Sequence, residues 1–534
     1  MGWQVTSRIY GGRRSSPATL QEYRAMASAL EDAGSSMCAL ASSWSQAAFD
    51  LGAERVSAPL CPALSTGTDT GMGLSAEHET LPYAALIAQC RERAEEAEAE
   101  GVRLKGLADL LTRAHSLYEQ ADMRARRTLT ELVQAGTQAH PGWASLSMAA
   151  IAAGGLGAGW LGEGKPNPAA ASYATAPFQE GYLSGIGGKL TRIPDGLGVL
   201  LTNEVNMAAG TIGKASAPAK NLLQGDRLEV RRVTTDAHVV RSSTSVAQSL
   251  ENLRRLAEER LGKIDLDSGL SYATIAVQRY ERADGTNAWL VTIPGTDGKY
   301  DSPFGWEQNV ELMSVDERQR RAADSSRMVV EAMERACIAP DEPVALIGHS
   351  QGGIVAAQIA ADQSERFDIQ HVVTAGSPVA NHPIPEKTWV TSIEIDQELV
   401  AALDGAENPA TDHWLTVRGS VSKAPDETTP TLNEDGSCTP SISSNVRGSS
   451  PYAAAPVRDS SGKMELSHWL KYHQAAYRNA TDLGSPAVME HERHFAGVIA
   501  GELRETQYYE GRMSHDDLVN PTPEASVQTE PVDR

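Results

Sequence analysis

Residues 344–361 read VALIGHSQGGIVAAQIAA and contain the most informative change of pattern in the chain. The apolar run Val344–Ile347 has the length and composition of a buried strand, and helical spacing of apolar residues begins at Gly352. Glycines two positions before and two positions after Ser350 leave room for a sharp turn with strained backbone. The stretch therefore predicts a strand, a tight turn that exposes Ser350, and a helix.

The pattern of strands and helices extends in both directions from this turn. Ala273–Val277 and Trp289–Ile293 flank the turn signal Ala283-Asp284-Gly285, which predicts a β-hairpin. A helix is predicted around residues 325–337, and further strands are predicted at residues 371–374 and 390–395. Strands and helices that alternate at this spacing predict a mainly parallel sheet covered by helices on both faces, which is an α/β fold.

A serine in such a turn can act as a nucleophile when a neighbouring histidine removes its proton. The reaction also needs hydrogen-bond donors for the oxyanion that develops on the substrate. We expect one donor to be the backbone N–H of Gln351, directly after the nucleophile. We expect the second donor in Pro294–Gly298, after an earlier strand, and favour Thr296.

The C-terminal half resembles a known family, the lipase-like α/β-hydrolases of actinobacteria that are related to the class 3 lipases. The residues that carry the resemblance are WLVTIPGTDG at 289–298, Trp306, Asn309, GHSQGGIVAAQIA at 348–360, TAGSPVAN at 374–381 and ELVAALDG at 398–405. The resemblance implies an α/β-hydrolase fold and an esterase or lipase activity on a carboxylic ester or lipid. Serine acyl transfer requires no cofactor and no metal, and we expect none.

The resemblance also implies an acidic residue after the strand at residues 390–395. An ungapped match puts Glu398 at that position, and Asp396 is the alternative. Glutamate and the absence of proline at Ala401 depart from the family pattern, so both carboxylates stay open. Either residue type can orient a catalytic histidine in this fold.

The catalytic base should follow the acid in the chain. The candidates are His413, His468, His473, His491 and His494. His413 precedes an apparent strand and is interpreted as structural. Ser467 is predicted to be an N-cap, which would place His468 at a helix start and His473 inside that helix. We favour His468 as the base and keep His473 as the alternative.

The N-terminal part has a different pattern, with apolar or small residues at alternating steps of three and four from Leu20 to Ala48. A second helical segment is predicted from Tyr83 to Val133, after a stretch rich in Gly, Pro, Ser and Thr at residues 57–80. Two antiparallel helices would cover each other's apolar stripe. We therefore predict an all-α helical hairpin domain over residues 1–133, able to pair with itself or with a partner chain.

The predicted hairpin resembles the WXG100-like modules that accompany type VII secretion substrates in actinobacteria. Tyr118–Asp122 matches the Y-x-x-x-D/E export signal, although Tyr280–Asp284 matches it too and the loop lacks the W-x-G tripeptide. The resemblance implies an alternative function, an exported lipolytic effector with the hairpin as its targeting module. A second alternative is a non-catalytic binding or scaffold protein on a decayed hydrolase fold.

The remaining segments complete the predicted organisation. Residues 134–224 are rich in Ala, Gly and Pro and are interpreted as a linker with short helices, residues 225–505 as the hydrolase domain, and residues 506–534 as a disordered tail. The linker contains the uncharged run Trp143–Gly162, which is just long enough to cross a bilayer. Because alanine and glycine fill most of it, we interpret the run as a buried or surface-docked segment.

Composition limits the choice of partners and compartment. The net charge of −22 over 534 residues disfavours nucleic acid as a partner. Five cysteines, spread far apart without a CxxC pair, indicate neither a zinc site nor a disulfide framework. The N-terminus lacks the apolar region of a Sec signal, so we expect a cytoplasmic protein or export by a non-Sec route.

Overall fold

The computed structural model describes residues 2–13, 17–57, 82–117, 119–163, 167–191, 204–424, 431–432, 438–439, 454–460 and 462–515. They belong to two compact units. The α/β unit comprises Met1–Arg14, Tyr118–Ser441 and Ala454–Arg534, and the hairpin unit comprises Ser15–Leu117 and Ile442–Ala453. Each unit is described by itself below.

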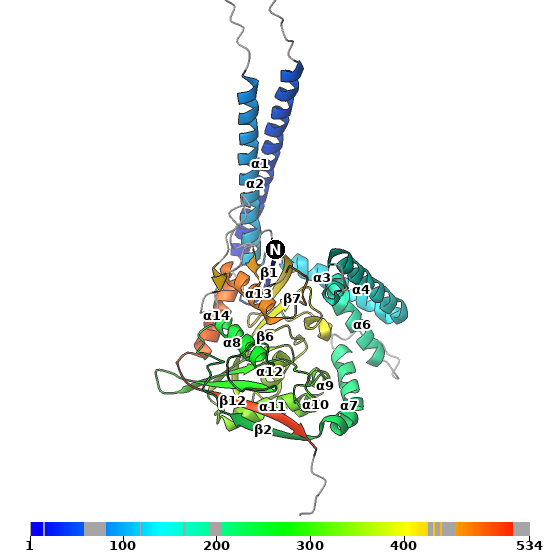
Figure 1. Ribbon diagram of the computed structural model, residues 1–534, viewed down its shortest axis with the longest axis vertical. Helices are drawn as coiled ribbons and strands as arrows, with labels where there is room; N and C mark the ends of the chain where they lie inside the picture. Colours follow the sequence, from blue (N-terminus) through cyan, green and yellow to red (C-terminus); the bar gives the residue numbers. More distant parts are fainter. Residues whose placement is uncertain are drawn as a thin grey trace, which may run out of the picture. The chain divides into compact units, whose positions relative to one another are not determined.

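The α/β unit is built on a ten-stranded sheet with the order β11-β1-β8-β7-β6-β5-β4-β3-β12-β2 (Figure 1). Strands β4 to β8 run parallel, and the other neighbours pair antiparallel. The strands are β1 (Trp3–Gly11), β2 (Arg227–Val233), β3 (Thr274–Glu281), β4 (Asn287–Ile293), β5 (Pro343–His349), β6 (Asp368–Ala375), β7 (Trp389–Ile395), β8 (Trp414–Lys423), β11 (Ala455–Pro456) and β12 (Glu502–Ser514). Thr431–Leu432 (β9) and Cys438–Thr439 (β10) form a separate two-stranded pair.

Helices cover both faces of this sheet, because successive side chains of a strand point to opposite faces. In β5, Ala345 and Ile347 pack with α8, α13 and α14, whereas Val344 and Leu346 pack with α11 and α12. The covering helices are α8 (Val246–Glu259), α9 (Glu307–Leu312), α10 (Glu317–Ala322), α11 (Asp324–Arg335), α12 (Gln351–Asp362), α13 (Leu470–Asp482) and α14 (Pro486–Val498), with the short 3-10 helix η2 (Ala401–Asp404). The predicted mainly parallel sheet between helical layers is therefore confirmed, as is the hairpin of β3 and β4.

The two ends of the chain correct the predicted domain boundaries. Residues 3–11 were assigned to the hairpin domain but form β1, which pairs with β8. Residues 506–514 were assigned to a disordered tail but belong to β12, which lies between β3 and β2. In β1, alternate residues from Trp3 to Ile9 are buried, as expected of an edge-side strand with one covered face. The rest of the predicted tail, residues 516–534, lies outside the described residues.

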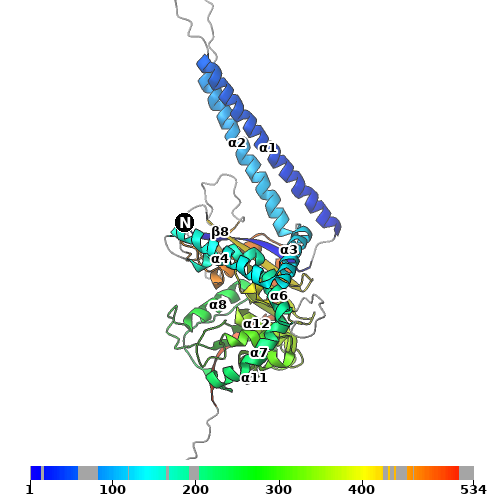
Figure 2. The same cartoon turned by 90° about the vertical axis from the view of Figure 1, so that its right-hand side faces the viewer.

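The segment interpreted as a linker is also corrected, because it is a layer of helices. The helices are α3 (Glu119–Ala139), α4 (Pro141–Glu163), α5 (Pro168–Thr175), the 3-10 helix η1 (Ala176–Phe178), α6 (Gln179–Thr191) and α7 (Glu204–Gln224). Helix α6 packs against α3 and α7, and α4 packs against α5 (Figures 1 and 2). Ala- and Gly-rich helices have weak periodic patterns, and this is why the sequence resembled a linker.

The hairpin unit consists of two long helices, α1 (Pro17–Ser57) and α2 (Tyr83–Ala114). Ala27, Gly34, Ala41 and Ala48 are buried, one every seven residues, which agrees with the predicted seam. A Cβ atom on Gly34 would lie 2.9 Å from the carbonyl oxygen of Gly101, so the backbones approach closely there. The second helix ends before the predicted Val133, at Ala114. Of the predicted loop at residues 57–80, Ser57 belongs to α1 and the rest lies outside the described residues.

Candidate active site

Ser350 lies in the turn between β5 and α12, in the conformation that the glycine pattern predicts. Its backbone has φ 53° and ψ −125°, which is strained for a residue with a side chain. A Cβ atom on Gly348 would lie 2.2 Å from the carbonyl oxygen of Gly352, and a Cβ on Gly352 would lie 2.0 Å from that of Ile293. Only glycine fits at these two positions, and the turn leaves the half-buried Ser350 at the helix start.

The two residues expected to bind an oxyanion flank Ser350. Gln351 is the first residue of α12, where backbone N–H groups have no carbonyl partner within the helix. The loop after β4 lies on the other side, because a Cβ on Gly295 would be 2.9 Å from the Cβ of Ser350. Thr296 follows Gly295 and is half-buried. Both expected donors therefore belong to segments that adjoin the serine.

A buried ion pair fixes the loop that contains Thr296. The guanidinium group of Arg260 lies 3.4 Å from the carboxylate of Asp297, and both side chains are buried. Arg260 also donates a hydrogen bond to the carbonyl oxygen of Gly295. The backbone N–H of Ala273 and the hydroxyl of Ser302 donate to Asp297 at 2.9 and 2.8 Å. These bonds hold the loop in one conformation next to Ser350.

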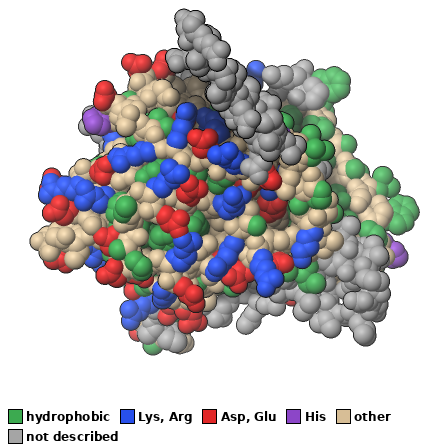
Figure 3. Space-filling model, turned by 90° about the horizontal axis from the view of Figure 1, so that it is seen from below, with side chains coloured by type: hydrophobic (Ala, Val, Ile, Leu, Met, Phe, Trp, Pro, Cys, Tyr) green, Lys and Arg blue, Asp and Glu red, His purple; other side chains and the backbone are tan. Residues whose placement is uncertain are grey.

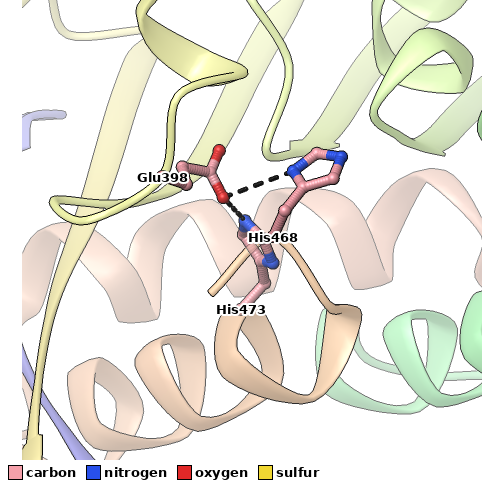
Figure 4. Close-up of side chains that lie close together, drawn as sticks. All are labelled: Glu398, His468 and His473. Atoms are coloured by element: carbon pink, nitrogen blue, oxygen red, sulfur yellow. Dashed lines mark ion pairs between the residues drawn. The ribbon is translucent and has the colours of Figure 1, made fainter. Parts of the chain in front are cut away.

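The carboxylate of Glu398 lies just beyond β7 and faces two histidines (Figure 4). Its Oε2 atom is 2.8 Å from Nε2 of His473 and 3.5 Å from Nδ1 of His468. Burial raises the pKa of Glu398, but the two histidines more than offset this and lower it to about 2. Glu398 is therefore an ionised, buried acceptor at neutral pH.

The two histidines differ in their remaining surroundings. The ring of His473 is fully buried in α13, and its second nitrogen, Nδ1, lies 3.4 Å from the carbonyl oxygen of Trp469 one turn earlier. The side chain of His468 is 28% exposed and precedes α13. Of the two rings, His468 is therefore the one that is partly open to solvent.

His349 connects the serine turn to this histidine. Its Nε2 atom donates to the carbonyl oxygen of His468 at 2.9 Å, and the two rings stack with centroids 4.7 Å apart. Burial and the neighbouring His468 lower the pKa of His349 well below its ordinary range, so the ring is neutral. The predicted N-cap role of Ser467 is wrong, since the N-cap of α13 is Trp469.

Asp396, the alternative acid, has a different charged neighbour. It lines a cavity of about 440 Å³ that Glu398 also lines, on the side of Arg418, whose guanidinium group pairs with Glu394 at 2.7 Å and with Glu180 at 3.4 Å. Burial lowers the pKa of Arg418, but Glu394, Glu180 and Asp396 raise it well above its ordinary value. The structure therefore brings Glu398 to the histidines and Asp396 toward an arginine.

The other candidate histidines lie elsewhere. His491 and His494 belong to α14 and contact His371 of β6, and His413 precedes β8. Sequence reasoning missed the role of Gly376, which has φ 59°. A Cβ atom there would lie 2.8 Å from His473 Nε2, 2.9 Å from Glu398 Oε1 and 3.0 Å from His468 Nδ1. Gly376 lies in the segment TAGSPVAN, which is part of the family resemblance. The sequence alone gave no reason why a glycine is needed at this position.

Glu398, His468 and His473 also offer a set of donors that a metal ion can use, with ligand atoms within 4.8 Å of one another. A tetrahedral zinc ion would separate adjacent ligand atoms by about 3.3 Å. The 2.8 Å separation between His473 Nε2 and Glu398 Oε2 is shorter than this and is a close ion-pair contact. The distances therefore do not match those of a tetrahedral zinc site.

Comparison with known proteins agrees with this architecture. Residues 273–387 match the family model Abhydrolase_8, described as alpha/beta hydrolase. The match begins at β3 and includes the loop after β4, the Ser350 turn and β6. No curated protein and no solved structure matches the chain significantly. The family match and the sheet together identify an α/β-hydrolase fold and favour a hydrolase-type activity.

Proposed function

Because the chain contains an α/β-hydrolase domain, we propose that it is a serine hydrolase that cleaves carboxylic esters. In this proposal Ser350 is the nucleophile, His468 the general base and acid, and Glu398 the carboxylate that orients His468. The backbone N–H groups of Gln351 and Thr296 bind the oxyanion. The observation that carries the proposal is the pairing of His468 Nδ1 with the buried Glu398 beside the strained Ser350 turn.

The proposed reaction has two halves. In the first, His468 Nε2 takes the proton of Ser350 as the hydroxyl oxygen attacks the ester carbonyl, and the N–H groups of Gln351 and Thr296 bind the resulting oxyanion. Collapse breaks the bond to the alcohol, which leaves with the proton from His468. In the second half, His468 deprotonates a water molecule, which attacks the acyl carbon. Collapse breaks the bond to Ser350, which takes the proton back from His468, and the acid is released. Ionised Glu398 stabilises the imidazolium ring in both halves.

The choice of an ester with an apolar group rests on the side chains around the site. Large apolar residues close in sequence to three of the proposed site residues are exposed, namely Leu399 after Glu398, Leu466 and Trp469 around His468, and Trp306 after the Thr296 loop. Exposed apolar side chains are typical of binding sites for apolar ligands where they form a patch. We therefore expect an acyl group or alcohol with a hydrocarbon portion.

Labelling with a fluorescent fluorophosphonate tests the proposal. The full-length protein should be labelled, and Ser350→Ala should not be, because the probe reacts only with an activated serine. Ser377→Ala is a matched control, since Ser377 is a buried serine in a neighbouring loop and should leave labelling intact.

The same experiment discriminates between the functions that the sequence left open. Absence of labelling in folded wild-type protein would contradict the proposal and favour a non-catalytic binding protein. Labelling that persists in Ser350→Ala would assign the reactive serine elsewhere. Turnover of p-nitrophenyl esters of increasing chain length would then measure the acyl preference.

A second candidate function, export of the hydrolase by a type VII-like route, is favoured by the long two-helix hairpin unit. Of the two matches to the export signal, Tyr280 is buried in β3, whereas Tyr118–Asp122 lies where the side chains are not described. Tyr118→Ala should therefore abolish export while leaving fluorophosphonate labelling unchanged. Appearance of that variant in the medium at the wild-type level would contradict this candidate.

A further inference from the structure

We propose that the exposed face of α4 docks on the surface of a phospholipid bilayer, with the helix lying along the surface. This inference is independent of the proposed ester hydrolysis, because it concerns a helix that contains none of the proposed catalytic residues. It rests on the side chains of α4 and on the way the helix is attached to the rest of the α/β unit.

Helix α4 presents one continuous apolar stripe to the outside. Its exposed members recur at alternating steps of three and four and are Trp143, Leu146, Ala150, Ala153, Gly157 and Trp160. Leu161 adds a further exposed apolar side chain at the same end. Trp143 is 73% exposed, and Leu146 and Trp160 are each 60% exposed. Among the described residues of α4, only Gly155 is buried.

The stripe has the chemistry of a lipid-facing surface. No charged residue occurs from Trp143 to Gly162, and α4 is, by length and composition, the one helix among the described residues that could cross a membrane. The two tryptophans lie about 25 Å apart along the helix, at either end of a small-residue surface. Tryptophan is enriched at the boundary between lipid headgroups and hydrocarbon. Protein interfaces are also rich in tryptophan but usually have a polar rim, and no charged residue occurs beside this stripe from Trp143 to Gly162.

The charges elsewhere on the unit support a zwitterionic lipid surface as the occupant. Figure 3 shows a face of the molecule on which Lys and Arg side chains are interspersed with Asp and Glu, as on an ordinary solvated surface. The chain as a whole has a net charge of −22 and would be repelled by strongly anionic lipids. An uncharged stripe can approach a zwitterionic bilayer without this repulsion.

The opposite side of α4 is attached to the unit through small residues. A Cβ atom on Gly155 would lie 2.5 Å from the carbonyl oxygen of Ala170, and a Cβ on Gly159 would lie 2.9 Å from the Cβ of Ala170. The two glycines, four residues apart, let α4 and α5 pack backbone against backbone. Ser145 also forms a hydrogen bond of 2.9 Å with the hydroxyl of Tyr182 in α6. This attachment favours a helix that stays on the protein and lies on a membrane rather than one that crosses it.

Helix α5 in turn contacts the segments that present the candidate active site. Ser172 donates to the carbonyl oxygen of Gln397 at 3.0 Å, next to Glu398. Tyr173 donates to the carbonyl oxygen of Glu465 at 3.1 Å, three residues before His468. Docking through α4 would therefore hold these segments close to the lipid surface.

Flotation with large unilamellar vesicles of phosphatidylcholine tests the proposal, using full-length Ser350→Ala protein so that the lipid is not consumed. The parent protein should float with the vesicles. Trp143→Glu and Trp160→Glu should each lower the vesicle-bound partition about tenfold or more, because an aromatic side chain that would enter the bilayer is replaced by a charge. Phe49→Glu is the matched control, since Phe49 is 72% exposed on α1 and should leave binding unchanged.

Failure of the parent protein to float would overturn the proposal, as would an equal loss in Phe49→Glu. Vesicle-bound protein that resists extraction by alkaline carbonate would also overturn it, because such resistance indicates a span. Self-association that the α4 variants abolish without vesicles would assign the stripe to a second copy of the chain. The same α4 variants, with Ser350 restored, are also tested for fluorophosphonate labelling. Labelling without vesicle binding would show that docking fails while the proposed hydrolase site is intact.

Discussion

The α/β unit contains two groups of histidines, and the presence of a carboxylate distinguishes them. His468 and His473 both face the carboxylate of Glu398. The second group consists of His371 from β6 with His491 and His494 from α14. In that group the Nδ1 atoms of His371 and His494 lie 3.0 Å apart, and Trp389 stacks on the ring of His494 at 4.3 Å.

The two groups also differ in charge. In the first group the histidines stabilise an ionised glutamate, with the pKa of Glu398 at about 2. In the second group, burial lowers the pKa of His371 well below its ordinary value and that of His491 to about 3. The histidines of the second group are therefore neutral, and their contacts connect α14 to the sheet. The comparison teaches that the buried carboxylate distinguishes the first group, whereas partial exposure does not, because His494 is half-buried like His468.

The largest expected effect comes from removing one histidine of each group. His468→Ala should lower kcat/KM for a short-chain p-nitrophenyl ester by about 10⁴-fold, because the proposed general base is lost. His494→Ala, in the group without a carboxylate, should stay within about threefold of wild type. Equal losses in the two variants would remove the distinction between the groups.

The next effect separates the two carboxylates. Glu398→Gln should lower kcat/KM by about 10³-fold, because a neutral amide no longer stabilises the imidazolium ring. Asp396→Asn should cost less than about tenfold, since its carboxylate lies on the side of Arg418. Steady-state kinetics of both variants measure this difference, and the reverse order would assign the acid to Asp396.

A smaller effect compares the two fully buried histidines, His473 and His371. Each change to glutamine should lower the free energy of unfolding by about 2 kcal/mol, because buried hydrogen bonds are disturbed. Only His473→Gln should also lower kcat/KM, by about tenfold, since His473 contacts Glu398. Urea unfolding and ester kinetics on the same preparations measure the two quantities. An activity loss in His371→Gln at equal stability would contradict this assignment.

The smallest effect concerns the dependence of stability on pH. His371 and His491 have lowered pKa values in the folded state, so acidification below about pH 6.5 protonates them in the unfolded chain first and favours unfolding. Each such group should contribute a slope of up to about 1.4 kcal/mol per pH unit. Glu398 contributes a further loss of folding stability only below about pH 4.5, because its pKa in the folded state is lower than that of an ordinary glutamate.

Urea unfolding at pH 7, 6 and 5 measures this slope. His491→Phe should reduce the slope between pH 6.5 and 5, whereas the exposed His238→Gln should leave it unchanged. An unchanged slope in His491→Phe would show that the second group does not control the acid sensitivity.

Local sequence was sufficient to predict the structure where residues close together in the chain determine it. The Ser350 turn requires glycine at two positions within a few residues, and the β3–β4 hairpin closes over a short turn. The seam of α1 repeats every seven residues, so its buried positions could be read from spacing alone. The prediction that this hairpin is an export module stays a prediction, because nothing in its packing identifies a partner.

Only the tertiary structure decided the features that depend on distant segments. Strand β1 pairs with β8, which lies more than 400 residues later in the chain. Strand β12 pairs with β2 and β3. The sequence around β1 and around β12 therefore showed no partner strand for either of them. The approach of Glu398 to His468 and His473, and of Asp396 to Arg418, depends on which atoms meet after folding. Sequence thus determined the Ser350 turn, because its geometry is local, whereas long-range packing determined which side chains surround Glu398.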